Sequence, residues 1–278
     1  MTRHGLSSPS VDSMRTLHVN DVDLAVLDRG AGSPVVFVHG FPLDHSMWVA
    51  QQVVVAERWR TIVPDLLGFG ASGVTPGRVT VEQHADDLAG LLDALGIADP
   101  VVLVGLSMGG YIAMQFYRTH RRRLRALVLC DTRAAADAPP VAAGRLEVAD
   151  RVERDGPAVL ADTMLPRLFS PRTLELRPEL VERARKMILG GNRVGLAATS
   201  RGLAVRPDFS DTVPQIDCPT LLVVGRHDPI STPAEMGAMA RNIAASQLAE
   251  IDDAGHLSPM ERPDQVNRAL VDFLDRIA

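Results

Sequence analysis

The chain of 278 residues has an ordinary globular composition, with 46% hydrophobic and 23% charged residues. Its length allows one large hydrophobic core. The net charge of −5 comes from acidic and basic residues mixed along the chain, and no basic run is interleaved with aromatics, so we expect no nucleic-acid surface. No apolar run reaches the length of a membrane span, and the first residues contain no apolar signal-peptide core. We therefore expect a cytoplasmic protein without a membrane partner.

The start of the chain and its two cysteines offer little chemistry. Residues 1–14 are polar and rich in serine, so we expect them to be poorly ordered. Cys130 and Cys218 both lie in or beside apolar runs, which is typical of buried core thiols. Two cysteines do not form the dense pattern of a secreted disulfide scaffold.

From residue 15 onward, strand patterns alternate with helix patterns. Two alternating stretches around Asn20 and Asp21 predict a β-hairpin, and short apolar runs predict buried strands. An amphipathic segment begins with the capping residue Thr80 and ends at Gly96. The expected strands lie within 15–30, 34–40, 61–72, 100–107, 124–132, 218–228 and 246–256, and the expected helices within 44–60, 80–96, 109–120, 233–243 and 262–277. This alternation predicts an α/β fold with a parallel sheet covered by helices on both faces.

The stretch 133–213 interrupts the alternation. It opens with an Ala/Pro-rich segment and then contains short helical patterns without a strand pattern. Apolar residues such as Met164 and Leu165 give these helices a face to bury. Because the strand pattern resumes afterwards, we expect 133–213 to be a helical lid inserted into a core made of 15–132 and 214–278, and not a separate domain.

The strongest chemical signal is a G-x-S-x-G motif that follows an apolar run and precedes a helical pattern. A serine at the tip of a sharp strand-to-helix turn has a strained backbone, and glycines two positions before and after it prevent clashes between strand and helix. The turn would present the hydroxyl at the carboxyl edge of the sheet, where ligands bind in open α/β sheets. We therefore predict that Ser107 is a nucleophile, with Gly105 and Gly109 as structural support.

A serine hydroxyl needs a base at neutral pH, and His256 is the best placed of the eight histidines. It stands just after the last strand pattern, where Gly255 allows a turn. His227 is a competitor in the turn after another strand. No pair of histidines shows metal-ligand spacing, so we expect no metal site and no cofactor.

The base in turn needs a carboxylate that fixes its tautomer. Asp228 follows a core strand, and the chain order Ser107, Asp228, His256 is typical of triads built on such an elbow. Asp131 also ends a strand and is the rival acid, with a cap at the start of the lid as its alternative role. We predict Asp228 as the acid of the triad.

A tetrahedral intermediate also needs two backbone donors. The strand ending at residue 38 leads into the motif HGFP. Because Pro42 lacks an N–H, the amide of Phe41 is the expected first donor, and the amide of Met108 is the second. His39 and Gly40 are expected to shape this loop.

The combination of HGFPLDHSMW, DLLGFGAS, GLSMGG, VVGRHD and AGHLSPMERP resembles the α/β-hydrolase family, over the chain from residue 15 to its end. Within that family it looks most like small bacterial carboxylesterases, enol-lactonases and cofactor-free haloperoxidase-like perhydrolases. The resemblance implies a mostly parallel eight-stranded sheet with the lid between strands 6 and 7. It places Ser107, Asp228 and His256 on the family's nucleophile, acid and base. It also places Phe41 and Met108 on the oxyanion donors.

Two departures narrow the resemblance. Carbon–carbon bond hydrolases of this family usually carry Asn before the nucleophile, whereas this chain has Leu106. Dehalogenases and epoxide hydrolases of this fold use an Asp nucleophile, whereas this chain has Ser107. The resemblance therefore favours the esterase and lactonase branch.

We expect an esterase or lactonase that acts on a small-molecule ester or lactone through an acyl-enzyme. The lid should set the preferred acyl chain length without taking part in the chemical step. Two alternatives stay open: a perhydrolase or acyltransferase that uses the same acyl-enzyme, and a non-catalytic ligand sensor on the same fold. The sequence does not indicate an oligomeric state. The residues expected to line the acyl pocket are Leu106, Leu168, Phe169 and Leu257.

Overall fold

The computed structural model describes residues 14–278, so the expectation for residues 1–14 falls almost entirely outside the described part. Eight strands form one sheet in the order β1-β2-β4-β3-β5-β6-β7-β8. Only the β1–β2 and β2–β4 pairs are antiparallel, which confirms the predicted mostly parallel sheet. The strands are β1 Arg15–Val19, β2 Val22–Arg29, β3 Pro34–Val38, β4 Arg60–Pro64, β5 Val101–Leu106, β6 Leu124–Cys130, β7 Thr220–Gly225 and β8 Ser246–Ile251.

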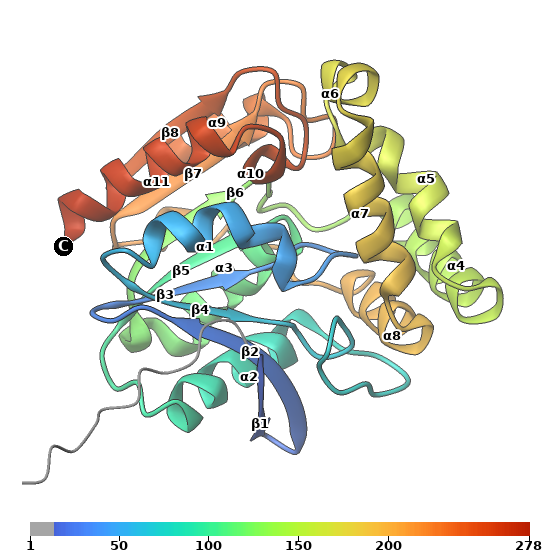
Figure 1. The fold of residues 1–278 in the computed structure, drawn as a ribbon, viewed down its shortest axis with the longest axis horizontal. Helices are drawn as coiled ribbons and strands as arrows, with labels where there is room; N and C mark the ends of the chain where they lie inside the picture. Colours follow the sequence, from blue (N-terminus) through green and yellow to red (C-terminus); the bar gives the residue numbers. More distant parts are fainter. Residues whose placement is uncertain (1–13) are drawn as a thin grey trace, which may run out of the picture.

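Helices cover both faces of the sheet, as the alternation predicted (Figure 1). Helices α1 and α11 contact each other on one face, and α2 and α3 contact each other on the other. The helices are α1 Val49–Val55, α2 Val81–Ala94, α3 Met108–His120, α4 Pro139–Asp155, α5 Ala158–Leu168, α6 Pro171–Leu176, α7 Pro178–Gly190, α8 Arg193–Leu203, α9 Pro233–Asn242, α10 Ser258–Glu261 and α11 Pro263–Ile277. The short helix α10 was not predicted. None of the helices in the described residues is long and apolar enough to cross a membrane.

The hairpin at the start of the sheet forms where the sequence predicted it. Leu17 pairs with Leu24, and Val19 pairs with Val22 at the turn. Asn20 and Asp21 have φ angles of 47° and 64°. Two consecutive left-handed residues are typical of the tight turns whose twist matches a β-hairpin, and Asn and Asp tolerate that conformation better than most residues.

The central strands bring several loops to one edge of the sheet. Strands β3 and β5 are buried at every position, because helices cover them on both sides. Val38 pairs with Gly105, and Leu106 pairs with Cys130, so the carboxyl ends of β3, β5 and β6 lie side by side. Cys130 is also opposite Val223 of β7. The loops after these four strands therefore meet, as expected for parallel strands.

Between β6 and β7, in a stretch that the structure describes throughout, the chain forms helices α4 to α8 and no strand. We call these five the inserted helices. Figure 1 shows them together beyond one edge of the sheet, in green, yellow and orange. Helix α4 packs against α8, and α5 packs against α7.

Helix α2 buries a histidine that has no polar partner. His84 is 1% exposed, and neither of its ring nitrogens forms a hydrogen bond within residues 14–278. Burial lowers the pKa of His84 to about 3, with a smaller contribution from His39. On the same helix, burial raises the pKa of Asp87 to about 6, which acts on stability in the opposite direction.

We predict that His84 makes the protein less stable in acid. Above its ordinary pKa of 6.5 the ring is neutral in both states. Below pH 6.5 His84 is protonated in the unfolded chain, whereas in the folded chain it stays neutral down to about pH 3. Proton binding therefore favours unfolding in this range. Between about pH 7.5 and about pH 5, His84→Leu should lose roughly 2 kcal/mol less folding free energy than the wild type. Denaturant unfolding of both proteins at both pH values measures this, and equal losses would contradict it.

Candidate active site

Ser107 lies in the turn between β5 and α3, with a φ of 52° that few non-glycine residues adopt. A Cβ on Gly105 would lie 2.2 Å from the carbonyl oxygen of Gly109. A Cβ on Gly109 would lie 2.3 Å from the carbonyl oxygen of Val38. Only glycine therefore fits at these two positions, and the turn leaves Ser107 partly exposed at the carboxyl edge of the sheet.

The end of β6 holds the backbone of this turn. The amide of Ser107 donates to the carbonyl oxygen of Cys130 at 2.9 Å, and the hydroxyl of Thr132 donates to the carbonyl oxygen of Ser107 at 2.8 Å. The strained residue is thus bound on both of its peptide groups. Sequence reasoning missed Thr132, because its only signal is its position near the end of a strand.

The structure brings Ser107, His256 and Asp228 into one hydrogen-bond chain. Nδ1 of His256 lies 2.8 Å from Oδ2 of Asp228, and Nε2 lies 2.9 Å from the hydroxyl oxygen of Ser107. Oδ1 of Asp228 accepts backbone N–H groups of Ile230 and Ser231 at 2.7 and 3.1 Å. A carboxylate that only accepts makes Nδ1 the protonated nitrogen, which leaves Nε2 free to accept the hydroxyl proton. Both His256 and Asp228 are 3% exposed, so little water competes for these bonds.

The competing histidine does not reach this chain. The side chain of His227 is exposed, and its backbone amide donates to the carbonyl oxygen of Ala254 at 2.8 Å. His227 therefore ties the loop after β7 to the loop that carries His256.

Asp131, the rival acid, is wholly buried but bonds elsewhere. Oδ1 accepts the amide of Gly225 at 2.8 Å, and Oδ2 bonds to the hydroxyl of Ser258. It is not the cap at the start of the inserted helices, because Ala138 occupies the N-cap position of α4 and no side chain forms a cap bond there. Burial raises the pKa of Asp131 well above its usual range, and the nearby carboxylate of Asp228 raises it further. Both effects favour the protonated form of Asp131, whose two hydrogen bonds join the end of β7 to α10.

The loop after β3 packs directly on the turn of Ser107. A Cβ on Gly40 would lie 2.7 Å from Cδ2 of Leu106 and 3.5 Å from Cβ of Ser107. Phe41 and Met108, the expected oxyanion donors, are both buried. Within residues 14–278, neither of their amides donates a hydrogen bond to the protein. Two unpaired N–H groups beside a serine hydroxyl suit a developing oxyanion.

His39 holds the loop after β3 in place through two hydrogen bonds. Its Nε2 accepts the amide of Leu66 at 3.1 Å, and its Nδ1 donates to the carbonyl oxygen of Gly40 at 3.1 Å. Burial lowers the pKa of His39, which keeps the ring neutral and so able to accept one bond and donate the other.

The residues expected to line an acyl pocket are all buried, at 0 to 2% exposure. They are Leu106, Leu168, Phe169 and Leu257. The amide of Leu257 donates to the carbonyl oxygen of Leu168 at 3.1 Å, so the inserted helices touch the segment that follows His256.

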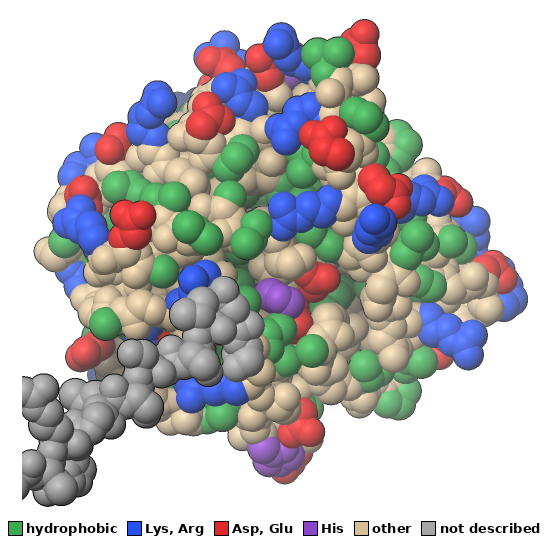
Figure 2. Space-filling model, viewed as in Figure 1, with side chains coloured by type: hydrophobic (Ala, Val, Ile, Leu, Met, Phe, Trp, Pro, Cys, Tyr) green, Lys and Arg blue, Asp and Glu red, His purple; other side chains and the backbone are tan. Residues whose placement is uncertain are grey.

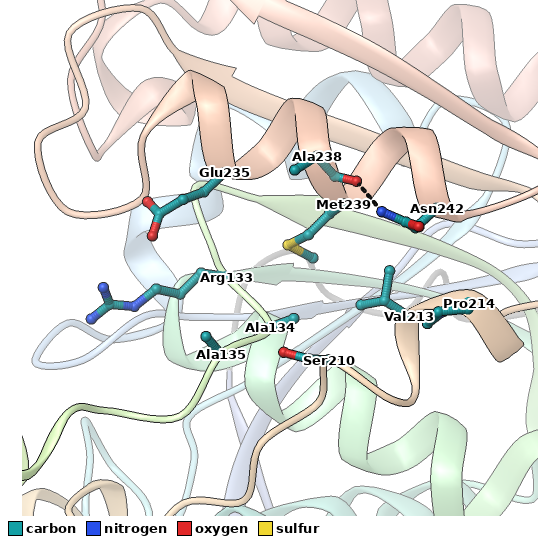
Figure 3. Close-up of a pocket in the computed structure, with 10 residues that line it drawn as sticks. All are labelled: Arg133, Ala134, Ala135, Ser210, Val213, Pro214, Glu235, Ala238, Met239 and Asn242. Atoms are coloured by element: carbon teal, nitrogen blue, oxygen red, sulfur yellow. Dashed lines mark hydrogen bonds between the residues drawn. The ribbon is translucent and has the colours of Figure 1, made fainter.

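A cavity of about 290 Å³ lies away from this site, where both connections of the inserted helices meet α9 (Figure 3). Arg133 and Glu235 lie at one end of it, and Val213, Pro214 and Met239 at the other. None of the three residues of the hydrogen-bond chain lines this cavity.

Among the described residues, Asp44, His45 and Asp65 come close enough to hold a metal ion. Their ligand atoms are already bonded within the protein. Oδ1 of Asp65 accepts from the amide and from Nδ1 of His45, and Oδ2 accepts from the amide of Ala71. Oδ1 of Asp44 accepts the amide of Ser46. The cluster therefore reads as a polar network that shapes the loop after β3.

Charged side chains of both signs are interspersed over the face shown in Figure 2, without a broad basic area. Surface ion pairs such as Arg58–Asp275 and Arg201–Asp150 fit this mixture.

A model of the α/β-hydrolase fold family matches residues 33–263. The chain belongs to the α/β-hydrolase family. The match spans every strand from β3 to β8 and all the residues of the hydrogen-bond chain.

Three proteins that are similar to this chain over nearly its whole length are an esterase and two enol-lactonases. A thermophilic esterase from Thermogutta terrifontis is 48% identical, with a TM-score of 0.93 over 96% of this chain and 99% of that chain. An enol-lactonase from Burkholderia xenovorans is 30% identical, with a TM-score of 0.87 over 94% of this chain and 100% of that chain. The 3-oxoadipate enol-lactonase 2 of Acinetobacter baylyi is 27% identical over 94% of this chain and 96% of its own length.

We predict that the same substitution has different effects at Asp228 and Asp131. Asp228→Asn should lower kcat by up to about four orders of magnitude, because an amide at this position favours the wrong imidazole tautomer. Asp131→Asn should stay within a few-fold of the wild type. Its carbonyl oxygen can still accept from Gly225, and its NH2 can donate to the hydroxyl of Ser258.

Hydrolysis rates of an activated ester, together with thermal melts of both variants, check this pair. An inactive Asp131→Asn protein beside an active Asp228→Asn protein would reverse the assignment of the acid.

Proposed function

We propose that this protein is a serine hydrolase that cleaves carboxylic esters or lactones, with Ser107 as nucleophile, His256 as base and Asp228 as acid. The observation that supports this most directly is the continuous hydrogen-bond chain from Asp228 through His256 to Ser107. The amides of Phe41 and Met108, which donate no hydrogen bond to the protein within residues 14–278, are the proposed donors to the oxyanion that acyl transfer creates.

In the first half of the reaction, Nε2 of His256 takes the proton of Ser107 as Oγ bonds to the carbonyl carbon. The carbonyl π electrons move to its oxygen, where the amides of Phe41 and Met108 stabilise the negative charge. The imidazolium gives its proton to the leaving alkoxide as the C–O bond breaks. Asp228 stays ionised and stabilises the imidazolium through Nδ1.

In the second half, His256 takes a proton from water, whose oxygen attacks the acyl-enzyme. The tetrahedral intermediate collapses, the proton returns to Oγ of Ser107, and the carboxylic acid leaves. For a lactone, the leaving alkoxide remains attached to the acyl group, so the product is a hydroxy or keto acid.

The substrate class rests on the relatives. An esterase at 48% identity and an enol-lactonase at 30% both match over nearly their whole length. Esters and lactones pass through the same acyl-enzyme, so a single site serves either substrate. A rate screen with acyl esters of graded length and with lactones tests the proposal. Peroxide or an alcohol that outcompetes water would favour the perhydrolase or acyltransferase alternative, and turnover no faster than the uncatalysed reaction would favour a sensor.

Ser107→Ala should remove nearly all hydrolysis and leave the fold intact. The side chain lies in a turn that the backbone bonds to Cys130 and Thr132 hold, and an Ala variant keeps both bonds. Removal of a triad nucleophile leaves only residual catalysis from binding and the oxyanion donors. Measurement of kcat alongside the thermal melt separates the two effects. Retained activity in a folded variant would exclude the mechanism.

We further propose that the inserted helices act as a lid that sets acyl-chain preference. Each buried methylene contributes roughly 0.8 kcal/mol, so loss of pocket contacts should change selectivity by about fourfold per carbon. Leu168→Ala removes a wholly buried side chain at the end of α5. It should change the ratio of kcat/KM between short and long acyl esters. An equal loss on all chain lengths would contradict a role in chain selection.

A further inference from the structure

The segment that carries His256 is bonded to the inserted helices through one buried carboxylate. Glu261, in α10, is 1% exposed. Its Oε1 accepts the amide of Gly255 at 2.7 Å, and its Oε2 accepts the amide of Ser170 at 2.8 Å. Gly255 directly precedes the base, and Ser170 caps the start of α6. One side chain therefore joins the loop of the base to the proposed lid.

Two further hydrogen bonds and one close backbone contact join the loop of His256 to the inserted helices. The amide of Leu257 donates to the carbonyl oxygen of Leu168 at 3.1 Å, and the hydroxyl of Ser170 donates to the carbonyl oxygen of Asp253 at 3.2 Å. A Cβ on Gly255 would lie 2.6 Å from the carbonyl carbon of Phe169. The two backbones are thus in direct contact, and the segments cannot separate without breaking bonds on both sides of His256.

The two hydrogen bonds that the Glu261 side chain accepts require a carboxylate. Both partners are backbone N–H groups, which can only donate, so the side chain between them must offer two acceptors. An amide offers one acceptor, and its NH2 would face the second N–H. Because Glu261 is 1% exposed, little water competes for the missing bond.

We propose that Glu261 is a positioning residue that couples the inserted helices to the catalytic base, so that the backbone of residues 168–170 belongs to the framework around His256. This rests on the proposed function, in which His256 is the base. Misplacement of a reacting group by about 1 Å costs up to about a hundredfold in rate. The lid is then not wholly separable from the chemical step. The backbone of residues 168–170 supports His256, and the side chains that face the acyl group select the chain length.

The test compares carboxyl-to-amide changes at two joints. Glu261→Gln should lower the maximal kcat by about tenfold to a hundredfold and change KM little. Asp208→Asn is the matched control. The carboxylate of Asp208 also accepts two backbone amides, those of Ala136 and Ser210, at 2.9 and 2.7 Å. It is exposed, however, and joins the two connections of the inserted helices to each other. We expect wild-type kcat for Asp208→Asn.

A second pair of variants, Ser170→Pro and Ser170→Ala, leaves the side chain of Glu261 unchanged. Ser170 has a φ of −63° after an extended residue, so its backbone conformation is open to proline, whose ring replaces the N–H and displaces Oε2 of Glu261. Ser170→Pro should lower kcat more than Ser170→Ala, which keeps the N–H to Glu261. The carboxyl groups of Asp228, Asp131 and Glu261 bond to His256, Ser258 and Gly255, so a change of charge among them also alters the electrostatics around the base. The kcat plateau above the acid limb of the pH profile is therefore the decisive readout.

Lower plateau kcat in both Glu261→Gln and Ser170→Pro supports the coupling. Lower melting temperatures with a wild-type plateau would overturn it, since Glu261 would then only hold the fold. If Glu261→Gln does not fold, the comparison of Ser170→Pro with Ser170→Ala decides. A wild-type protein without esterase activity, or an active Ser107→Ala variant, would instead refute the proposed function itself.

Discussion

The left-handed backbone of Ser107 is the constraint on which the site depends. It exists because α3 begins so close to β5 and β3 that positions 105 and 109 have no room for a side chain. A strained residue persists only where its surroundings hold it, and here the end of β6 binds both of its peptide groups. The same close approach sets α3 against the sheet and places the serine hydroxyl beside the loop that follows β3.

The neighbouring loops differ in how the sheet supports them. The loops after β3, β5, β6 and β7 follow strands with a partner on each side, so the register of two neighbouring strands fixes where each loop begins. The loop of His256 follows β8, which is an edge strand bonded only to β7. It needs support from side chains, and the structure supplies it from two directions. Asp131 binds Ser258 from the sheet, and Glu261 binds Gly255 and reaches the inserted helices.

Sequence patterns were sufficient for the features that local chemistry determines. The mostly parallel sheet, the hairpin at Asn20 and Asp21, and the helices on both faces follow from periodicity and turn residues. The hydrogen-bonded residues of the site were named from motifs that lie at strand ends. The work of Glu261 could not be found in this way, because its partner Ser170 is 91 residues away and is a backbone amide with no residue-type signal. The role of Asp131 could not be found from the sequence either, because its position after a strand fits an acid of the triad as well as a structural carboxyl group that joins two segments.

Asp131 and Glu261 show why burial alone does not define the work of a carboxyl group. Each is almost completely shielded from water, and each joins two segments near His256. One partner of Asp131 is a hydroxyl, which can either donate or accept, so a neutral carboxyl group satisfies it. Both partners of Glu261 are amides, which only donate, so two acceptor oxygens are required. An amide can therefore replace the first side chain and not the second. This difference follows from the direction of each hydrogen bond and not from the distance of either residue to the reacting serine.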